Sequence, residues 1–195
     1  MTTFTMIKKN YAQGLKDFAN VSIEKKNYVS LYKQETENTV LFSNSHIIIE
    51  MDKHVFNSIV PTLPDKYQRF YNDFKEIDLK KFMYDIIAGS FARGKVTSLV
   101  MSQPNAFNTK TLCKRVCSMS NNEDGNTYTS YCYIDDVYFN IVKHFSATND
   151  MIFSKDSKCI IFNNKATNCR ALIMCIFTPS LQIKNEIAHE LGVEL

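Results

Sequence analysis

A glycine-rich stretch ending in lysine, Gly89 to Lys95 in the sequence GSFARGK, has residue types and a spacing that bind nucleotide phosphates. In a P-loop, this pattern follows a strand and opens a helix, because loop N–H groups and the helix N-terminus hold the phosphates. Here a helical pattern precedes Gly89 and a β-rich run follows Lys95, which is the reverse order. Val96 also stands where a Ser or Thr would bind Mg²⁺. The stretch is therefore predicted to be a basic loop and not a nucleotide site.

The same loop belongs to a longer tract of one charge sign. Residues 86–122 contain five cations and no Asp or Glu, in a chain whose net charge is only +3. Such a tract suggests an anionic partner, although a solvated lysine-rich face would have the same composition. The five cations are Arg93, Lys95, Lys110, Lys114 and Arg115.

Metal and catalytic patterns are weak. The six cysteines include no C-x-x-C pair, and the four histidines lack ligand spacing. Asp135 and Asp136 could form an acid–base or metal-binding pair, but acidic residues at a helix N-terminus explain them more simply. We therefore expect no metal, no cofactor and no catalysis, with a small enzyme kept as an alternative.

Composition favours a globular, cytosolic protein. Apolar residues make up 45% of the 195 residues and charged residues 22%, as in ordinary globular domains. The N-terminus MTTFTMIKKNYAQG has no apolar signal region, and the longest apolar run, Ala171 to Phe177, has strand length. We expect no membrane contact and reduced thiols in the cytoplasm.

The first third of the chain predicts a mixed arrangement. Two strands around the polar corner Ser43-Asn44-Ser45 should precede a short helix that Pro61 and Pro64 end. The full series of predicted elements is a strand over 3–7, a helix over 8–20, a strand over 27–34, strands within 39–51 and a helix over 52–60.

The middle third predicts a helix and a basic hairpin. The helix covers 76–89 and stops at Gly89, and strands over 95–101 and 110–119 precede a turn centred on Asp124-Gly125. Between the thirds, the stretch TLPDKYQRFYNDF has four aromatic residues near cations. These rings could stack on bases or pack in a core.

The last third repeats the first. A strand over 127–134 leads into a helix over 135–145, with Val137, Ile141 and Phe145 on one stripe and Asp135 or Asp136 as N-cap. Two short strands within 150–164 and a longer strand over 168–179 follow. The segments LFSNSHIIIEM and IFSKDSKCIIF each place an apolar run, a Ser and a polar turn before a second apolar run. Internal repetition of this kind restricts the possible folds strongly.

Two such units in one domain resemble the DNA sliding clamp, or processivity factor, fold. The corner Ser43 to His46 is similar to a clamp hairpin, and Arg170 to Pro179 is similar to the terminal clamp strand. Cys175 follows Met174 where clamps usually have proline, and residues 63–122 lie outside the resemblance. The layout also resembles uncharacterised small phage and mobile-element proteins of AT-rich bacteria.

The predicted fold is α+β, a pseudo-two-fold pair of β-α-β-β(-β) units with an inserted helix and basic hairpin. We expect one compact domain with a first unit over 1–62, an insertion over 63–126, a second unit over 127–180 and a C-terminal amphipathic helix over 181–195. That helix could pack on its own domain or present itself to a partner.

The resemblance implies a non-catalytic, DNA-associated accessory protein, phage or mobile-element encoded. Clamps contact phosphates through cations on the helices that line their hole, which here gives Lys8, Lys9 and Lys16 beside the cations of the basic tract. A ring would require several domains to associate as a homo-oligomer. A second hypothesis is an anti-defence (anti-CRISPR-like) protein that binds and inhibits a host nuclease complex, and a small enzyme is the third.

Overall fold

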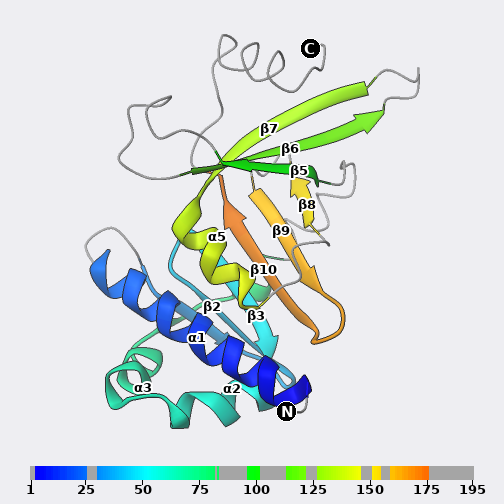
Figure 1. Cartoon of the computed structure of the whole chain (residues 1–195). Coiled ribbons are helices and arrows are strands. Elements are labelled where there is room, and N and C mark those ends of the chain that lie inside the picture. The colour runs from blue at the N-terminus through cyan, green and yellow to red at the C-terminus, as the bar shows by residue number, and fades with distance from the viewer. Residues whose placement is uncertain are drawn as a thin grey trace.

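The computed structural model describes residues 3–25, 30–81, 83, 96–101, 113–121, 127–145, 151–154 and 159–175. It is an α+β structure with a seven-stranded and a three-stranded sheet (Figure 1). The helices are α1 (Thr3–Glu24), α2 (Lys53–Ile59), the 3-10 helix η1 (Val60–Thr62), α3 (Asp65–Asn72) and α5 (Asp136–Lys143). The strands are β1 (Tyr32–Glu35), β2 (Thr39–Ser43), β3 (Ile47–Asp52), β4 (Lys75–Glu76), β5 (Val96–Met101), β6 (Cys113–Asn121), β7 (Thr127–Asp135), β8 (Met151–Ser154), β9 (Cys159–Asn164) and β10 (Cys169–Met174).

The large sheet combines strands from both ends of the chain. Its order is β4-β1-β2-β3-β10-β9-β8, and every pairing is antiparallel except that of β1 with β4. The strands β3 and β10 meet at the centre, where Ile48 lies opposite Leu172. An α-β-β-β series therefore occurs twice, as α1-β1-β2-β3 and as α5-β8-β9-β10, and the two series contribute three adjacent strands each.

Helix α1 carries one buried stripe along 22 residues. Tyr11, Leu15, Phe18 and Ser22 are buried, at spacings of three or four residues, which places them on one helical face. That stripe packs on the sheet face that Val40, Phe42, Ile47, Ile49 and Met51 present. Figure 1 shows α1 and α5 together on this face of the sheet.

Pro61 and Pro64 mark the end of α2, as predicted, and the start of α3. Helix α2 begins after Asp52, whose carboxylate accepts a hydrogen bond from Val55 N at 2.9 Å, and it gives way to η1, which contains Pro61. Pro64 is the N-cap of α3. The short breaks turn the chain back so that the buried rings of α3 contact Phe18 of α1.

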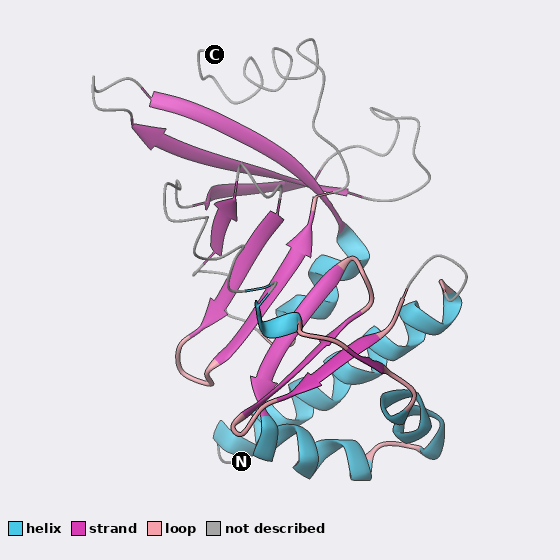
Figure 2. Ribbon diagram, turned by 180° about the vertical axis from the view of Figure 1, so that it is seen from behind, coloured by secondary structure: helices cyan, strands magenta, loops and turns pink. Residues whose placement is uncertain are grey.

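The opposite face of the sheet has a smaller apolar cluster. Leu41, Ile48, Cys159, Ile161 and Leu172 project from the strands, because side chains alternate between the two faces of a strand. Leu79 and Met83, which follow β4, cover part of this cluster. Figure 2 shows this face of the sheet, seen from behind the view of Figure 1.

The three-stranded sheet has the order β5-β6-β7 and lies beyond one end of the large sheet (Figure 1). The strands β6 and β7 pair along nine residues each, from Cys113 opposite Asp135 to Asn121 opposite Thr127. The pairing of β5 with β6 bears out the predicted basic hairpin. The strand over 127–134, expected in the second unit, pairs with β6 in this small sheet instead, and the residues of the Asp124-Gly125 turn lie outside the described part of the chain. Strand β7 then continues directly into α5.

Two local predictions are wrong. Residues 3–7 form the first turns of α1 instead of a strand, so the first series begins with a helix. Val137 is 40% exposed, and the buried face of α5 is made by Tyr138, Phe139, Ile141 and Val142. Of the two alternatives left open for the aromatic stretch, core packing is the one observed, because the rings of Tyr67, Phe70 and Tyr71 are core residues. The predicted helical stop at Gly89 and the helix over 181–195 lie outside the described residues.

Candidate functional site

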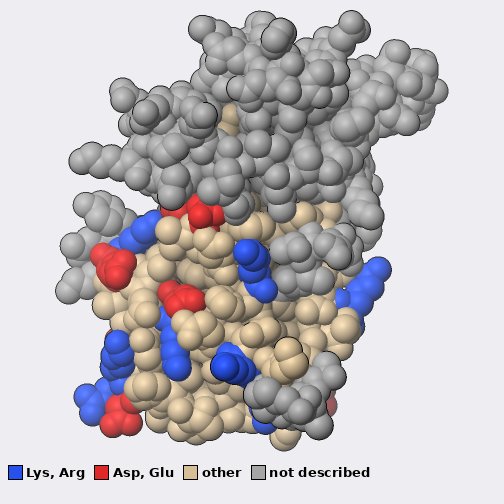
Figure 3. All heavy atoms as spheres, in the orientation of Figure 1, with Lys and Arg blue, Asp and Glu red and all other residues tan. Residues whose placement is uncertain are grey.

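The face formed by α1 and α5 is the first candidate surface. The predicted cations Lys8, Lys9 and Lys16 are all on α1, where Lys9 is exposed and the other two are partly exposed. Lys143 in the last turn of α5 adds a further exposed cation. Figure 3 shows that basic side chains are spread over this face with acidic ones between them. The face is therefore of mixed charge with a basic excess along α1.

The two helices are held at close range. A Cβ atom added at Gly14 of α1 would lie 2.6 Å from Phe145 Cε2 and 2.7 Å from His144 Cβ. The hydroxyl of Tyr11 lies 2.6 Å from Thr167 Oγ1 and 3.3 Å from the backbone oxygen of Phe145. His144 Nε2 lies 3.2 Å from Asp17 Oδ2. These contacts fix the spacing of the helices, and hence of the cations they carry.

The basic tract joins the molecule next to α5. Lys114 and Arg115 belong to β6, where they are paired with Ile134 and Tyr133 of β7. Since β7 runs into α5, the backbone of these two cations is fixed close to the N-terminus of that helix. Arg93, Lys95 and Lys110 lie outside the described residues, although β5 begins at Val96, directly after Lys95. A strand following the lysine is the order opposite to that of a P-loop.

A polar junction links the end of α1, the β2–β3 corner and the start of α5. Asp135 is the N-cap of α5 and accepts a hydrogen bond from Val137 N at 2.8 Å. Its other carboxylate oxygen lies 3.2 Å from Lys25 Nζ. The same ammonium group lies 4.7 Å from the centre of the Tyr138 ring, within the range of a cation–π contact. Asp135 is thus bound to both units of the chain.

His46 also contacts Tyr138. The two rings are stacked with centroids 5.2 Å apart. Burial lowers the pKa of His46, the nearby charge of Lys25 lowers it further, and Asp135 raises it. Asn44 supports this corner, because its Nδ2 donates to Ser22 Oγ at 3.1 Å and its Oδ1 accepts from Ile47 N at 3.2 Å. The imidazole is therefore held in a fixed position and favours the neutral form.

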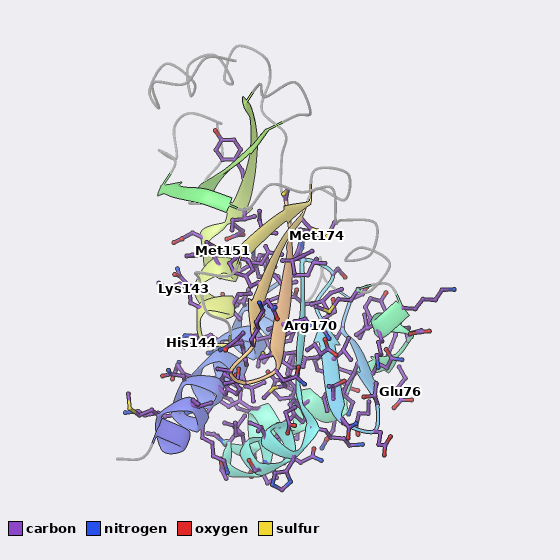
Figure 4. The ribbon with its side chains drawn as sticks, turned by 90° about the vertical axis from the view of Figure 1, so that its right-hand side faces the viewer. Glu76, Lys143, His144, Met151, Arg170 and Met174 are labelled. Atoms are coloured by element: carbon purple, nitrogen blue, oxygen red, sulfur yellow. The ribbon has the colours of Figure 1, made fainter. Side chains whose placement is uncertain are left out.

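A pocket of about 420 Å³ opens beside His46 on the sheet face that α1 and α5 do not cover. Its walls are mainly apolar and come from β1, β3, β10 and the segment after β4. The apolar lining residues are Tyr32, Ile48, Ile77, Leu79 and Met174. Figure 4 places Met174 beyond Arg170 along β10, with Lys143 and His144 at the end of α5 to the left in this view and Glu76 of the edge strand β4 to the right.

Four polar residues complete the lining of this pocket: Ser43, Ser45, His46 and Asp78. Asp78 accepts hydrogen bonds from Lys81 N at 3.0 Å and from Gln34 Nε2 at 3.2 Å. These bonds, the Lys81 N–H foremost, lower the pKa of Asp78, so its carboxylate is charged at neutral pH. Ser43 Oγ accepts a hydrogen bond from Ser45 N at 3.2 Å. The pocket thus combines an apolar floor with hydrogen-bond acceptors and one negative charge.

The described residues contain no group of three or more His, Cys, Asp or Glu side chains arranged to hold a metal ion. Burial raises the pKa of the Cys169 thiol to about 12, so this thiol is protonated at neutral pH and is a poor nucleophile. Across the helices described, none is long and apolar enough to cross a membrane.

Comparisons with known proteins give one structural similarity. No family model matches the sequence, and no curated protein matches it. Among solved structures, the chain is similar to the DNA polymerase III subunit beta DnaN sliding clamp of Bartonella birtlesii LL-WM9, with a TM-score of 0.32 and 10% sequence identity. The match covers 89% of this chain and 64% of the clamp chain. At this TM-score the similarity does not establish a shared fold.

Sequence reasoning missed the polar junction and the pocket. The residues Ser43, Asn44 and Ser45 predict a turn, which the positive φ of 72° at Ser45 bears out, but they do not indicate the stacking of His46 on Tyr138. A signal was available for the junction, because Asp135 was a predicted N-cap. Its partner Lys25 lies 110 positions away in sequence, and nothing local indicated that contact.

Proposed function

We propose that the protein is a non-catalytic, DNA-associated accessory protein of clamp type that contacts phosphates without reading the base sequence. A single observation supports this most directly. The two helices α1 and α5 lie side by side on one face of a continuous sheet, and α1 presents Lys8, Lys9 and Lys16 from that face. Cations on adjacent helices at fixed spacing suit a regular row of phosphates.

The proposal includes an internal two-fold relationship. The series α1-β1-β2-β3 and α5-β8-β9-β10 are taken as two copies of one unit, related by an axis between β3 and β10. The strand order β1-β2-β3-β10-β9-β8 supports it, because each copy contributes its strands in the same order outward from the centre. On this basis the helices of the two copies become equivalent, as in a clamp domain. We further propose a phage or mobile-element origin and assembly into a homo-oligomer.

The basic tract supplies the second part of the proposed interface. The backbones of Lys114 and Arg115 are anchored by β7 near the start of α5, so the basic tract joins the molecule next to the proposed helix surface. Each phosphate contact releases condensed counterions, so affinity falls as salt rises. For three contacts the loss between 50 and 200 mM salt is about 40-fold.

Fluorescence anisotropy with a labelled 30-base-pair duplex tests the proposal. We expect binding at 50 mM salt, the same affinity for unrelated sequences, and weakening at 200 mM. Two triple charge reversals separate the surfaces: Lys9→Glu, Lys16→Glu and Lys143→Glu on the helices, and Lys95→Glu, Lys114→Glu and Arg115→Glu in the tract. Each should weaken binding about 10-fold or more at low salt.

A third triple reversal is the matched control. Lys75, Lys80 and Lys81 are exposed and lie on β4 and the segment after it, outside α1 and α5. Reversing them changes the net charge by the same amount and leaves the proposed interface unaltered. This variant should bind within about twofold of wild type if contact is local. Equal losses in all three variants, or no binding at low salt, would contradict the proposal. Light scattering on the wild type measures its oligomeric state.

A further inference from the structure

We propose that the pocket beside His46 binds a compact organic amine, a ligand with an apolar body and one cationic group. All nine lining residues belong to the described part of the chain. The pocket lies on the sheet face opposite α1 and α5, so this inference does not depend on DNA binding.

The size and walls of the pocket select the body of the ligand. A volume of about 420 Å³ falls within the usual range of small-molecule sites. Ile48 and Leu79 are almost fully buried at its floor, and Tyr32 and Met174 pack against the same cluster. These walls contribute little polar surface, so an aromatic or branched aliphatic group would lose water on entry without leaving polar groups unpaired.

The polar residues select the charge of the ligand. Asp78 is the only charged residue that lines the pocket, and hydrogen bonds from Lys81 N and Gln34 keep it ionised. His46 favours its neutral form and can accept a hydrogen bond, as can the hydroxyl of Ser43. No lysine or arginine lines the pocket to hold an anion. The lining therefore complements a donor with positive charge and disfavours a carboxylate or phosphate.

The preference for a cation is expected to be moderate. Lys80 and Lys81, two and three residues after Asp78, partly offset its charge, although neither lines the pocket. Asp78 is also exposed, so solvent screens its attraction for a ligand. A three- to fivefold preference for cation over neutral is about what an exposed pair supplies.

Three probes of one shape test the inference: phenethylamine, phenethyl alcohol and 3-phenylpropionate, titrated into ¹⁵N-labelled full-length protein at pH 7.5. We expect amide shifts at Ser45, Ile48 and Leu79 with a dissociation constant of about 1–10 mM for the amine. The alcohol should bind about three- to fivefold more weakly, and the carboxylate more weakly again. Binding without shifts at these residues, or no binding by the amine, would overturn the inference.

Asp78→Asn is the matched variant, because an asparagine oxygen can still accept the hydrogen bond from Lys81 N while the charge is removed. It should bring the affinities for amine and alcohol within twofold of each other. Asp73→Asn, an exposed aspartate at the end of α3, makes the same charge change elsewhere and should leave the preference intact. An unchanged amine preference in Asp78→Asn, or an equal loss in Asp73→Asn, would refute the assigned role of Asp78.

Discussion

Gly14 of α1 packs directly against the ring of Phe145, at the point where the N-terminal and C-terminal halves of the chain meet on the helix side of the sheet. Any side chain at Gly14 would overlap that ring, since a Cβ atom would lie 2.6 Å from Cε2. Phe145 is fully buried and contacts Tyr11 and Phe42 as well, so it cannot move aside freely. The glycine therefore sets how closely α1 and α5 approach.

Replacing Gly14 with alanine should destabilise the protein, even though alanine is the better helix former by about 1 kcal/mol. The overlap with Phe145 costs more, because overpacking a rigid core costs about 1–3 kcal/mol. We expect a net loss of up to about 2 kcal/mol in the free energy of unfolding, measured by urea denaturation.

Two further variants check the cause of that loss. Asn10→Ala, at an exposed position of the same helix, should be neutral or slightly stabilising. In a Phe145→Leu background, Gly14→Ala should cost less than it does in the wild type, since a shorter side chain makes room. A Gly14→Ala protein as stable as wild type would mean that the helices can separate without cost.

The central strands are joined by an ion pair. Glu50 of β3 lies directly opposite Arg170 of β10, with 2.9 Å between Arg170 Nε and Glu50 Oε2, and the carboxylate side chain is only 2% exposed. Arg170→Met should leave a buried charge without its partner and cost about 3 kcal/mol. Replacing both residues, as Glu50→Leu with Arg170→Met, should be less harmful than Arg170→Met alone. Chemical denaturation of the three variants at pH 7 measures this, and a double variant worse than the single one would contradict the explanation.

Helical periodicity and apolar runs bounded by polar turns predicted the fold best. Tyr11, Leu15 and Phe18 indicated the core of α1, because burying one face imposes a fixed period on a helix. Apolar runs on either side of polar turns indicated β2, β3, β9 and β10. The same reasoning failed at residues 3–7, where Thr, Phe and Ile favour strands locally. There Ile7 stands four residues before Tyr11 and extends the helical stripe into the core, so tertiary packing overrode local preference.

The candidate site was less predictable because it depends on contacts between distant residues. The cations of α1 were visible in the sequence. The pairing of Lys25 with Asp135 and the stacking of His46 on Tyr138 join positions about a hundred residues apart. Neither follows from composition or spacing. The aromatic residues of α3 show the converse, since their sequence left base stacking and core packing both open, and their burial assigns them to the core.

The N-cap of α5 should matter more than the ion pair it also makes. Asp135→Ala removes the acceptor for Val137 N and should cost about 1–2 kcal/mol of stability. Asp135→Asn keeps an oxygen at that position and loses only the pair with Lys25, whose side chain is 38% exposed, so its cost should stay below about 1 kcal/mol. Thermal denaturation of both variants measures the difference in their stability. If Asn were as harmful as Ala, the charge and not the cap would be the stabilising element.

His46 should make stability depend on pH. Burial, with Lys25 adding to it, lowers the pKa of His46 in the folded protein below the ordinary value of about 6.5, while Asp135 opposes the shift. The unfolded chain then binds a proton more readily than the folded one. The stability that neutral His46 contributes is therefore complete above about pH 6.5 and is lost as pH falls toward the folded pKa. His46→Gln should remove this part of the pH dependence. NMR titration of the His46 ring should give a pKa below 6.5 that rises in Lys25→Met, because a nearby positive charge has been removed, whereas a wild-type value at or above 6.5 would contradict the burial of this ring.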